Sequence, residues 1–166
     1  MILKPLKLKD TRYTWSPGID TTRLAPAYSA TGEAYETVKN TTPNAADDLL
    51  TTIEDYGTFL VSVMKGTGLK PEIFQEMTTA QVESNRGKHF GLGFEIYSMD
   101  NGEYALTHGG SDKGVQTVFF IFPKTGQGLL IFTNSDTGVS LYEDLLKQYL
   151  GDKGQKIFDL ETKPRT

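Results

Sequence analysis

The sequence predicts an α+β protein in which one antiparallel sheet is flanked by helices. Three observations predict it: helical periodicity over residues 51–80, four apolar runs separated by turn signals over 90–134, and an amphipathic segment over 140–150. Strands that follow one another through tight turns form an antiparallel sheet, and helices grouped before and after it are typical of the α+β class. Because 166 residues suffice for one buried core, residues 1–166 are expected to form a single domain.

Residues 1–50 are predicted to be rich in loops. Thr, Pro and Gly are scattered through them, and isolated aromatic residues such as Trp15 and Tyr28 follow neither the helical nor the strand period. We expect these loops to lie over the rest of the molecule, with their aromatic side chains anchoring them to the core.

Two helices are predicted within residues 51–80. Thr51-Thr-Ile-Glu54 matches a capping box, and Gly66 is placed to end the helix that begins there. Pro71 is tolerated in the first turn of a helix, so a second, short helix is expected from Pro71 to about Thr79, followed by a polar connection over 81–88. The apolar face of the first helix consists of Ile53, Tyr56, Phe59, Leu60, Val63 and Met64.

The antiparallel sheet is predicted over residues 90–134. Asp100-Asn-Gly-Glu103 is a hairpin signal between an apolar run that begins at Phe90 and a strand over 104–107. Two further strands, 115–122 and 129–133, are joined by a tight turn.

One helix is predicted at the C-terminal end. Ser140 is expected to cap it, Leu146 and Leu150 belong to its buried stripe, and Gly151 ends it. The tail after Gly151 is expected to be a surface strap or a frayed end.

Composition argues against several kinds of partner. A net charge of -4 offers no basic patch for nucleic acid or for an anionic membrane, and no apolar run approaches the ~20 residues of a membrane span. The chain has no cysteine and only two histidines, so we expect no metal site and no cofactor. No secretion signal is recognised near the start, and the compartment is left open.

His108-Gly109-Gly110-Ser111 is the most informative stretch for chemistry. Two glycines after an imidazole let backbone N–H groups approach a ligand closely. On composition alone, a strand that ends in a flexible turn explains the same residues, and that reading is favoured about two to one.

The order of several motifs resembles the serine β-lactamase, penicillin-binding protein and esterase family. The stretch from Met1 to Thr11 is similar to the family's Pro-Leu-Gly-Met-x-Asp-Thr segment, with Lys7 in place of Gly. The stretch over 44–56 resembles its Ala-Gly-Gly-Leu-x-Ser-Thr-x-Glu-Asp helix start, with Asp47 and Asp48 in place of glycines. The stretch over 90–94 resembles its Tyr-Gly-Leu-Gly-Trp strand, and His108 to Gly110 its third motif, followed by Phe-Thr-Asn-Ser over 132–135.

This resemblance implies a partial β-lactamase or transpeptidase-like fold and gives roles to four residues. His108 would hydrogen-bond the substrate or its carboxylate, and Gly109 and Gly110 would let a small acyl substrate lie against the strand. The backbone N–H of Ser111 would face the developing oxyanion, and such donors are worth ~3 kcal/mol in acyl transfer. Lys124-Thr-Gly126 is a literal Lys-Thr-Gly, but we expect it to be only a turn.

The family's chemistry also needs a Ser with a Lys three residues later, and a Tyr-x-Asn or similar motif. In the family both precede the region that this chain resembles, so we expect both motifs, and with them the catalytic nucleophile, to be absent from this chain. The family's first strand would then be missing too, and the strand from Leu129 to Thr133 would have an open edge. We expect that edge to be covered by a homo-oligomer or by an N-terminal partner chain.

Three functional readings follow. The first is the C-terminal part of a β-lactamase-related serine hydrolase, acting on a β-lactam, ester or peptide and inactive alone. The second is a non-catalytic ligand-binding or regulatory module. The third is one half of a split enzyme, which a partner carrying the missing motifs would complete.

Overall fold

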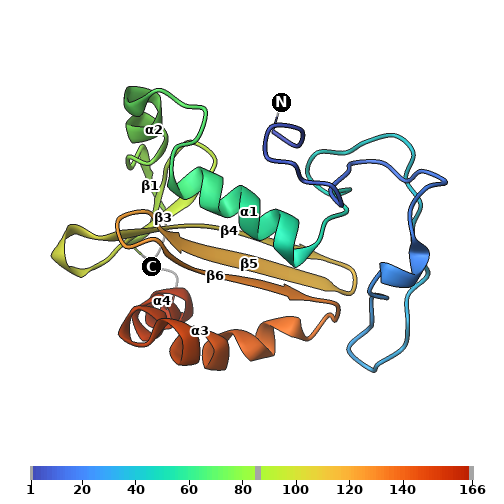
Figure 1. The fold of residues 1–166 in the computed structure, drawn as a ribbon. Coiled ribbons are helices and arrows are strands. Elements are labelled where there is room, and N and C mark those ends of the chain that lie inside the picture. The colour runs from blue at the N-terminus through green and yellow to red at the C-terminus, as the bar shows by residue number, and fades with distance from the viewer. Residues whose placement is uncertain (1, 85–86, 165–166) are drawn as a thin grey trace.

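The computed structural model describes residues 2–84 and 87–164, and a six-stranded antiparallel sheet lies at its centre (Figure 1). The strands pair in the order in which they occur in the sequence, so each neighbours the strand that follows it. They are β1 (Val82–Glu83), β2 (His89–Phe90), β3 (Glu95–Ser98), β4 (Tyr104–Asp112), β5 (Val115–Phe122) and β6 (Gln127–Thr133). The predicted α+β class is confirmed.

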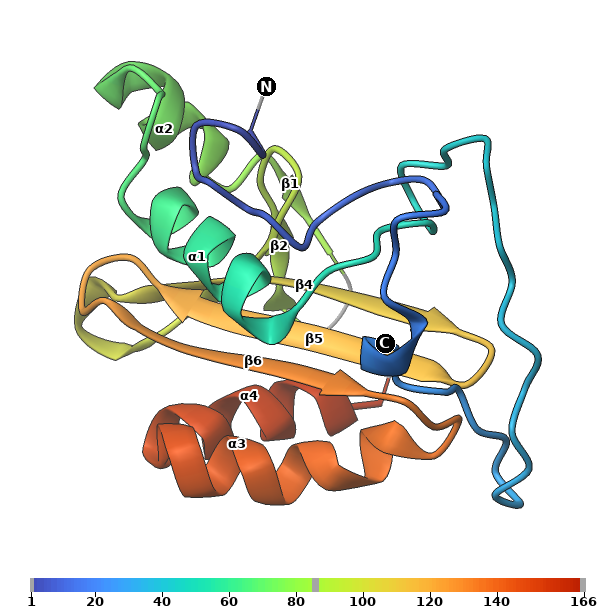
Figure 2. The same ribbon diagram turned by 45° about the vertical axis from the view of Figure 1, so that its right-hand side comes forward.

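Helices cover both faces of this sheet (Figures 1 and 2). One side carries α1 (Ile53–Met64) and α2 (Pro71–Met77), and the other carries α3 (Tyr142–Leu150) and α4 (Asp152–Thr162). Within the described ranges, the connections contain the short 3-10 helices η1 (Thr21–Arg23), η3 (Asp100–Gly102) and η4 (Gly138–Leu141). No helix within the described ranges is long and apolar enough to cross a membrane.

Each face of the sheet has its own apolar cluster, because side chains alternate along a strand. The cluster under α1 contains Leu60, Ile96, Leu106, Phe119 and Ile121. The cluster under α3 and α4 contains Tyr97, Met99, Ala105, Phe120, Phe122, Leu146, Leu150 and Ile157. The sheet is therefore buried between two layers along most of β5.

The start of α1 differs by one residue from the predicted capping box. Thr52 is the N-cap, and its hydroxyl accepts a hydrogen bond from the backbone N–H of Asp55 at 3.2 Å. The Asp55 carboxylate accepts from the backbone N–H of Asp10 and the hydroxyl of Thr11, each at 2.8 Å. Helix α1 thus holds the N-terminal segment, residues 2–50, in place.

The apolar run that begins at Phe90 is not one continuous strand. It folds back on itself as β2 and β3, and Gly91 N donates to Phe94 O at 2.8 Å across the turn. A Cβ on Gly91 would lie 2.5 Å from Met77 O, so only glycine fits beside the end of α2. β1 lies in the stretch predicted to be a polar connection, of which residues 85–86 lie outside the described ranges.

The C-terminal region also differs from the prediction. Ser140 lies in η4 and makes no side-chain cap, and α3 begins at Tyr142. The tail is neither a strap nor frayed as far as Thr162, because it forms α4, with Ile157 fully buried. Lys88 ties α4 to the sheet through ion pairs with Glu95 at 2.6 Å and Glu161 at 2.9 Å.

Residues 2–50 are mostly loops, as predicted. Single β-bridges join Arg12 to Leu50 and Tyr28 to Ser135, so the segment is held at one end of the sheet. Met1, the first residue of the Pro-Leu motif, lies outside the described ranges.

Candidate functional site: the second half of β4

His108, Gly109, Gly110 and Ser111 lie within β4, not after its end. Strand β3 pairs with β4 only from Ser98 opposite Tyr104 to Glu95 opposite Thr107. From His108 to Asp112, β4 pairs with β5 alone, and all five residues are exposed. Within the described ranges, the backbone groups on the other side of this segment therefore face no strand.

The two faces of this segment are distinct. Leu106 belongs to the cluster under α1, so His108 and Gly110 lie on the α1 face, and Gly109 and Ser111 lie on the face of α3 and α4. A Cβ on Gly110 would lie 3.0 Å from Thr117 Oγ1, which leaves little room for a larger residue. The hydroxyl of buried Thr107 donates to Phe119 O and fixes the strand where the exposed segment begins.

A second constellation holds the turn between β4 and β5. The Asp136 carboxylate accepts from the backbone N–H of Gly114 at 2.6 Å and from the Tyr35 hydroxyl at 2.8 Å. These two hydrogen bonds lower the pKa of Asp136, because they stabilise its charged form. Tyr28 N donates to Asn134 O, and Asp136 N donates to Tyr28 O, both at 3.0 Å. The N-terminal segment is thereby fixed beside the end of β4.

The loop that enters α1 reaches the same end of β4. The carboxyl group of Asp112 raises the pKa of Asp47, because a protonated Asp47 can donate a hydrogen bond to it and because two negative charges there repel each other. Asp48 accepts from Asn40 Nδ2 and from Asn44 N, each at 2.6 Å. Asp47 thus borders the exposed segment, and Asp48 holds the loop that precedes α1.

Sequence reasoning did not find Tyr35, Asp112 or Asp136. Asp136 is distant in sequence from Tyr35 and from Gly114, and no local pattern links the three. The replacement of glycines at Asp47 and Asp48 was the only local signal that this border differs.

The expectation that the chain contains no Ser-x-x-Lys motif is wrong, because one serine has the family's spacing. Ser62-Val-Met-Lys65 is a literal Ser-x-x-Lys at the C-terminal end of α1. The Ser62 hydroxyl donates to Phe59 O in its own helix at 2.7 Å. Ser62 is two positions from buried Leu60, about 200° around the helix, so it points away from the sheet that carries His108.

The chain's second histidine and its literal Lys-Thr-Gly lie elsewhere. His89 is in β2, opposite Ile96, away from the second half of β4. Lys124-Thr-Gly126 forms the turn between β5 and β6, where Gly126 N donates to Phe122 O at 2.8 Å. Within residues 2–84 and 87–164, no group of three or more His, Asp or Glu side chains is placed to bind a metal ion.

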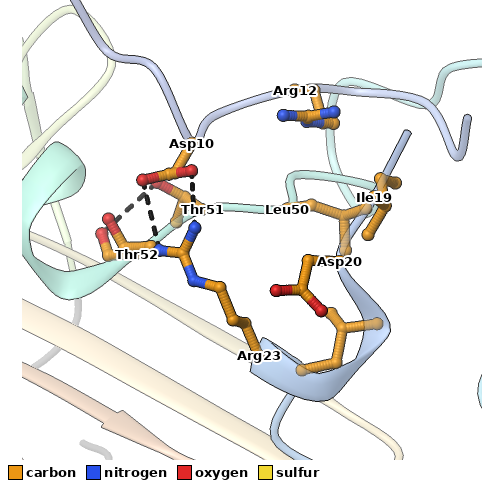
Figure 3. A pocket seen from close by; sticks show the side chains of 9 residues that line it. Asp10, Arg12, Ile19, Asp20, Arg23, Leu50, Thr51 and Thr52 are labelled. Atoms are coloured by element: carbon orange, nitrogen blue, oxygen red, sulfur yellow. Dashed lines mark hydrogen bonds and ion pairs between the residues drawn. The ribbon is translucent and has the colours of Figure 1, made fainter.

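A small pocket lies between the N-terminal segment and the loop before α1 (Figure 3). It has a volume of about 110 Å³, and none of His108 to Ser111 lines it. Arg23 reaches Asp10 there with hydrogen bonds of 2.8 and 3.2 Å. Because these exposed charges neutralise one another, we assign no ligand to this pocket.

The fold defines the class of protein. The six-stranded antiparallel sheet between helical layers is similar in fold to a penicillin-binding protein homologue. Residues 1–150 match the family model described as Beta-lactamase, so the chain belongs to the Beta-lactamase family. None of the curated protein sequences matches it.

Solved structures show the same similarity. A D-stereospecific amidohydrolase from Streptomyces sp. is 25% identical with a TM-score of 0.65, and the match covers 86% of this chain and 45% of that one. An octameric penicillin-binding protein homologue from Pyrococcus abyssi is 21% identical with a TM-score of 0.71, covering 93% of this chain and 37% of that one. A D-amino acid amidase from Ochrobactrum anthropi SV3, complexed with D-phenylalanine, is 23% identical with a TM-score of 0.61. That match covers 81% of this chain and 45% of that one. The chain thus spans less than half the length of each.

Proposed function

We propose that this chain is the C-terminal part of a β-lactamase-related serine hydrolase and supplies one wall of its acyl-ligand site. The observation that carries the proposal is the second half of β4, where the family's third motif, His108 to Gly110, and the Ser111 that follows it are exposed on a strand with one unpaired side. A ligand with an acyl group and a carboxylate fits such a wall, because backbone donors and an imidazole can both reach it.

Each residue has a part in this wall. His108 would donate a hydrogen bond to the ligand carboxylate from the α1 face of β4. The backbone N–H of Ser111 would meet the acyl oxygen, where a fixed donor stabilises developing negative charge. Gly109 and Gly110 would keep side chains out of the space that the ligand occupies.

The chain alone is expected not to complete acyl transfer. A serine nucleophile needs a base within hydrogen-bond reach and a position beside the oxyanion donors. Ser62 donates instead to Phe59 O and points away from the sheet, which argues against its use despite Lys65. A polypeptide that carries a competent Ser-x-x-Lys would turn the chain into one half of a split enzyme.

Intact mass after incubation with a fluorophosphonate probe, and separately with benzylpenicillin, tests the inactivity of the chain. We expect no adduct and no turnover of a chromogenic ester. Ser62→Ala is the decisive companion variant, because an adduct that it abolishes would identify Ser62 as a working nucleophile and overturn this part of the proposal.

Amide NMR during titration with benzylpenicillin tests the ligand wall. We expect the largest shift changes from His108 to Asp112, and we expect His108→Ala to reduce them. His89→Ala is the matched control, because it removes the other histidine, in β2. Shift changes that do not include this segment, or that His108→Ala leaves unaltered, would contradict the proposed ligand wall. The chain would then still belong to the family but lack this site.

A further inference from the structure

We infer that Asp136 is a positioning residue for the proposed ligand wall, because its carboxylate holds the turn at the end of β4 against the N-terminal segment. This inference rests on the proposed function, since it adds a residue that acts on the ligand only through the strand. Three features support it: the geometry of the turn, the two hydrogen bonds that Asp136 accepts, and the close packing of the N-terminal segment on the turn.

The turn between β4 and β5 does not match the twist of its strands. Lys113 and Gly114 form it, because Asp112 and Val115 are the last residues that pair across the hairpin. The two-residue turns that match strand twist have a positive φ at both central residues or at the first. Here only the second, Gly114, has a positive φ, of 72°. Such a turn splays the strands that it joins, so the end of β4 depends on contacts outside its own hairpin.

Asp136 provides such a contact from the segment that follows β6. Gly114 is buried, and its backbone N–H donates to Asp136 Oδ1 at 2.6 Å. A buried N–H group needs a partner, so this hydrogen bond restricts where the turn can lie. The other carboxylate oxygen, Oδ2, accepts from the Tyr35 hydroxyl at 2.8 Å. One carboxylate thus joins the turn to the N-terminal segment.

The N-terminal segment lies beside this end of the sheet (Figures 1 and 2) and packs on the turn. A Cβ on Gly114 would lie 2.8 Å from Tyr35 Cδ2, and Lys113 Nζ lies 4.3 Å from the centre of the Tyr35 ring. The backbone of Asp136 is held separately, since its N–H donates to Tyr28 O at 3.0 Å. A change of the Asp136 side chain therefore releases the turn while the backbone contact with Tyr28 stays in place.

The turn is one of two supports for the wall. From His108 to Asp112, β4 pairs with β5 alone within the described ranges, so β5 and the turn set the position of this segment. Gly109 and Gly110 lie in it and give its backbone additional conformational freedom. A turn that moves would displace the N–H groups that the wall offers to an acyl oxygen. A hydrogen bond to an ionised acceptor contributes enough to change an equilibrium constant by on the order of tenfold.

The contact depends on the charge of Asp136. The hydrogen bonds from Gly114 N and Tyr35 lower the pKa of Asp136, and the positive charge of Lys113 adds a smaller effect in the same direction. Among the described residues, the titratable groups that face the contact are Lys113 in the turn and Tyr35, with Glu33 near it, in the N-terminal segment. Because the pKa is lowered, the contact is complete at neutral pH and is lost only as the pH falls below the ordinary aspartate value of about 4.

Asp136→Asn tests the inference, because an amide of the same size has one acceptor atom in place of two. Amide NMR of the chain without ligand, at neutral pH, is the first measurement. We expect the Gly114 amide to exchange at least about tenfold faster and the amide shifts of residues 108–112 to change. Tyr35→Phe removes one of the two hydrogen bonds but keeps the ring, and should change the same amides less.

Asp159→Asn is the matched control. Asp159 is exposed on α4, and its carboxylate accepts one hydrogen bond, from Gln155 Nε2 at 2.7 Å. The variant removes the same charge from a place remote from the turn. It should leave the Gly114 amide and the shifts of residues 108–112 unchanged.

An acid titration distinguishes positioning from a purely structural role. The Ser111 amide shift should follow a transition below about pH 4, and Asp136→Asn should remove that transition. A transition caused by Asp47 should remain in the variant, at higher pH, because the pKa of Asp47 is raised. Titration with benzylpenicillin at neutral pH should then show an affinity about tenfold weaker in Asp136→Asn.

The ligand-free and ligand-bound measurements fail separately. If Asp136→Asn leaves the shifts of residues 108–112 unchanged, even with a lower unfolding midpoint in urea, Asp136 is only structural and the inference is overturned. An unchanged affinity for benzylpenicillin would overturn it as well. If the unaltered chain does not bind benzylpenicillin at this segment, the proposed function fails, while the exchange of Gly114 and the shifts of residues 108–112 still decide whether Asp136 sets the position of the strand.

Discussion

Asp55 is the residue that joins the N-terminal segment to the helical layer. Its carboxylate accepts two hydrogen bonds, from Asp10 N and Thr11 Oγ1, and Thr11 also contacts Thr51 Oγ1 at 2.8 Å. Thr11 is almost fully buried, so its hydroxyl depends on these partners. The Asp-Thr pair noted in the sequence resemblance therefore has a structural reason, which is to dock on the first turn of α1.

Replacing Asp55 by Ala is expected to lower the free energy of unfolding by about 1–3 kcal/mol, the cost of leaving buried polar partners unsatisfied. Urea denaturation followed by circular dichroism measures it. Glu54→Gln, in the same turn but exposed, should change stability much less. Equal effects of the two variants would mean that the contact with Asp10 and Thr11 contributes little.

At this scale the sequence predicted residue types better than their partners. The resemblance placed His108 and its glycines on a strand, and they are on one, although composition alone favoured the end of a strand. It could not predict that the Asp136 carboxylate would accept hydrogen bonds from Gly114 and Tyr35. The three residues come together only when the end of β6, the β4–β5 turn and the N-terminal segment meet. Ser62 and Lys65 show the opposite case. They have the spacing of the family's motif, but the Ser62 hydroxyl donates to Phe59 O in its own helix and does not face His108.

Among the elements, α4 is the largest that the sequence pattern did not predict. Its buried residues include Gly154 and Ile157, and a Cβ on Gly154 would lie 1.9 Å from Leu146 O. Glycine therefore permits α3 and α4 to pack closely, and Gly151, with φ of 57°, makes the sharp turn between them. The short spacing of Gly154, Ile157 and Phe158 carried the signal, although the tail after Gly151 was expected to be a surface strap or a frayed end.

Truncating Ile157 to Ala is expected to destabilise the protein by about 2–5 kcal/mol, because the side chain is fully buried and leaves a cavity. Ile157→Val should cost only about 0.5–1.5 kcal/mol, which keeps the experiment informative if the larger truncation prevents folding. Thermal unfolding measures both, with exposed Gln155→Ala as control. A neutral Ile157→Ala would mean that α4 is not part of the cooperative unit.

The sequence indicated β5 and β6 best, whereas β1 was expected to be a polar connection and the run after Phe90 to be one strand. β5 and β6 appear where continuous apolar runs and a Pro-Gly turn placed them. The run after Phe90 was misread as one strand because its glycines resemble strand residues of the family. They instead form a turn under the end of α2, and only the position of Met77 explains why.

The whole molecule has two regions: a sheet that is covered by helices on both faces, and an N-terminal segment that is mostly exposed and has few hydrogen bonds to the sheet. β5 has a strand on each side and carries four consecutive buried residues, Phe119 to Phe122. Most residues between 13 and 49 are half-buried or exposed and make few hydrogen bonds to the sheet. Stability should therefore differ between the two regions.

Hydrogen exchange at neutral pH should show this difference. We expect the amides of β5 to exchange slowest, through global unfolding, and most amides of residues 13–49 to exchange faster by at least about two orders of magnitude, through local opening. Mass spectrometry of peptic fragments resolves the two regions. Equal protection would show that the N-terminal segment unfolds only together with the sheet.

The sequential order of the strands also bears on how the chain reaches this structure. Every pairing from β1 to β6 joins strands that are neighbours in sequence, so the sheet can assemble through short loop closures of low contact order. The bridge between Tyr28 and Ser135, by contrast, closes a loop that contains all six strands of the described sheet. The meander can therefore form first, and the segment that borders the second half of β4 would be the last part of the molecule to settle.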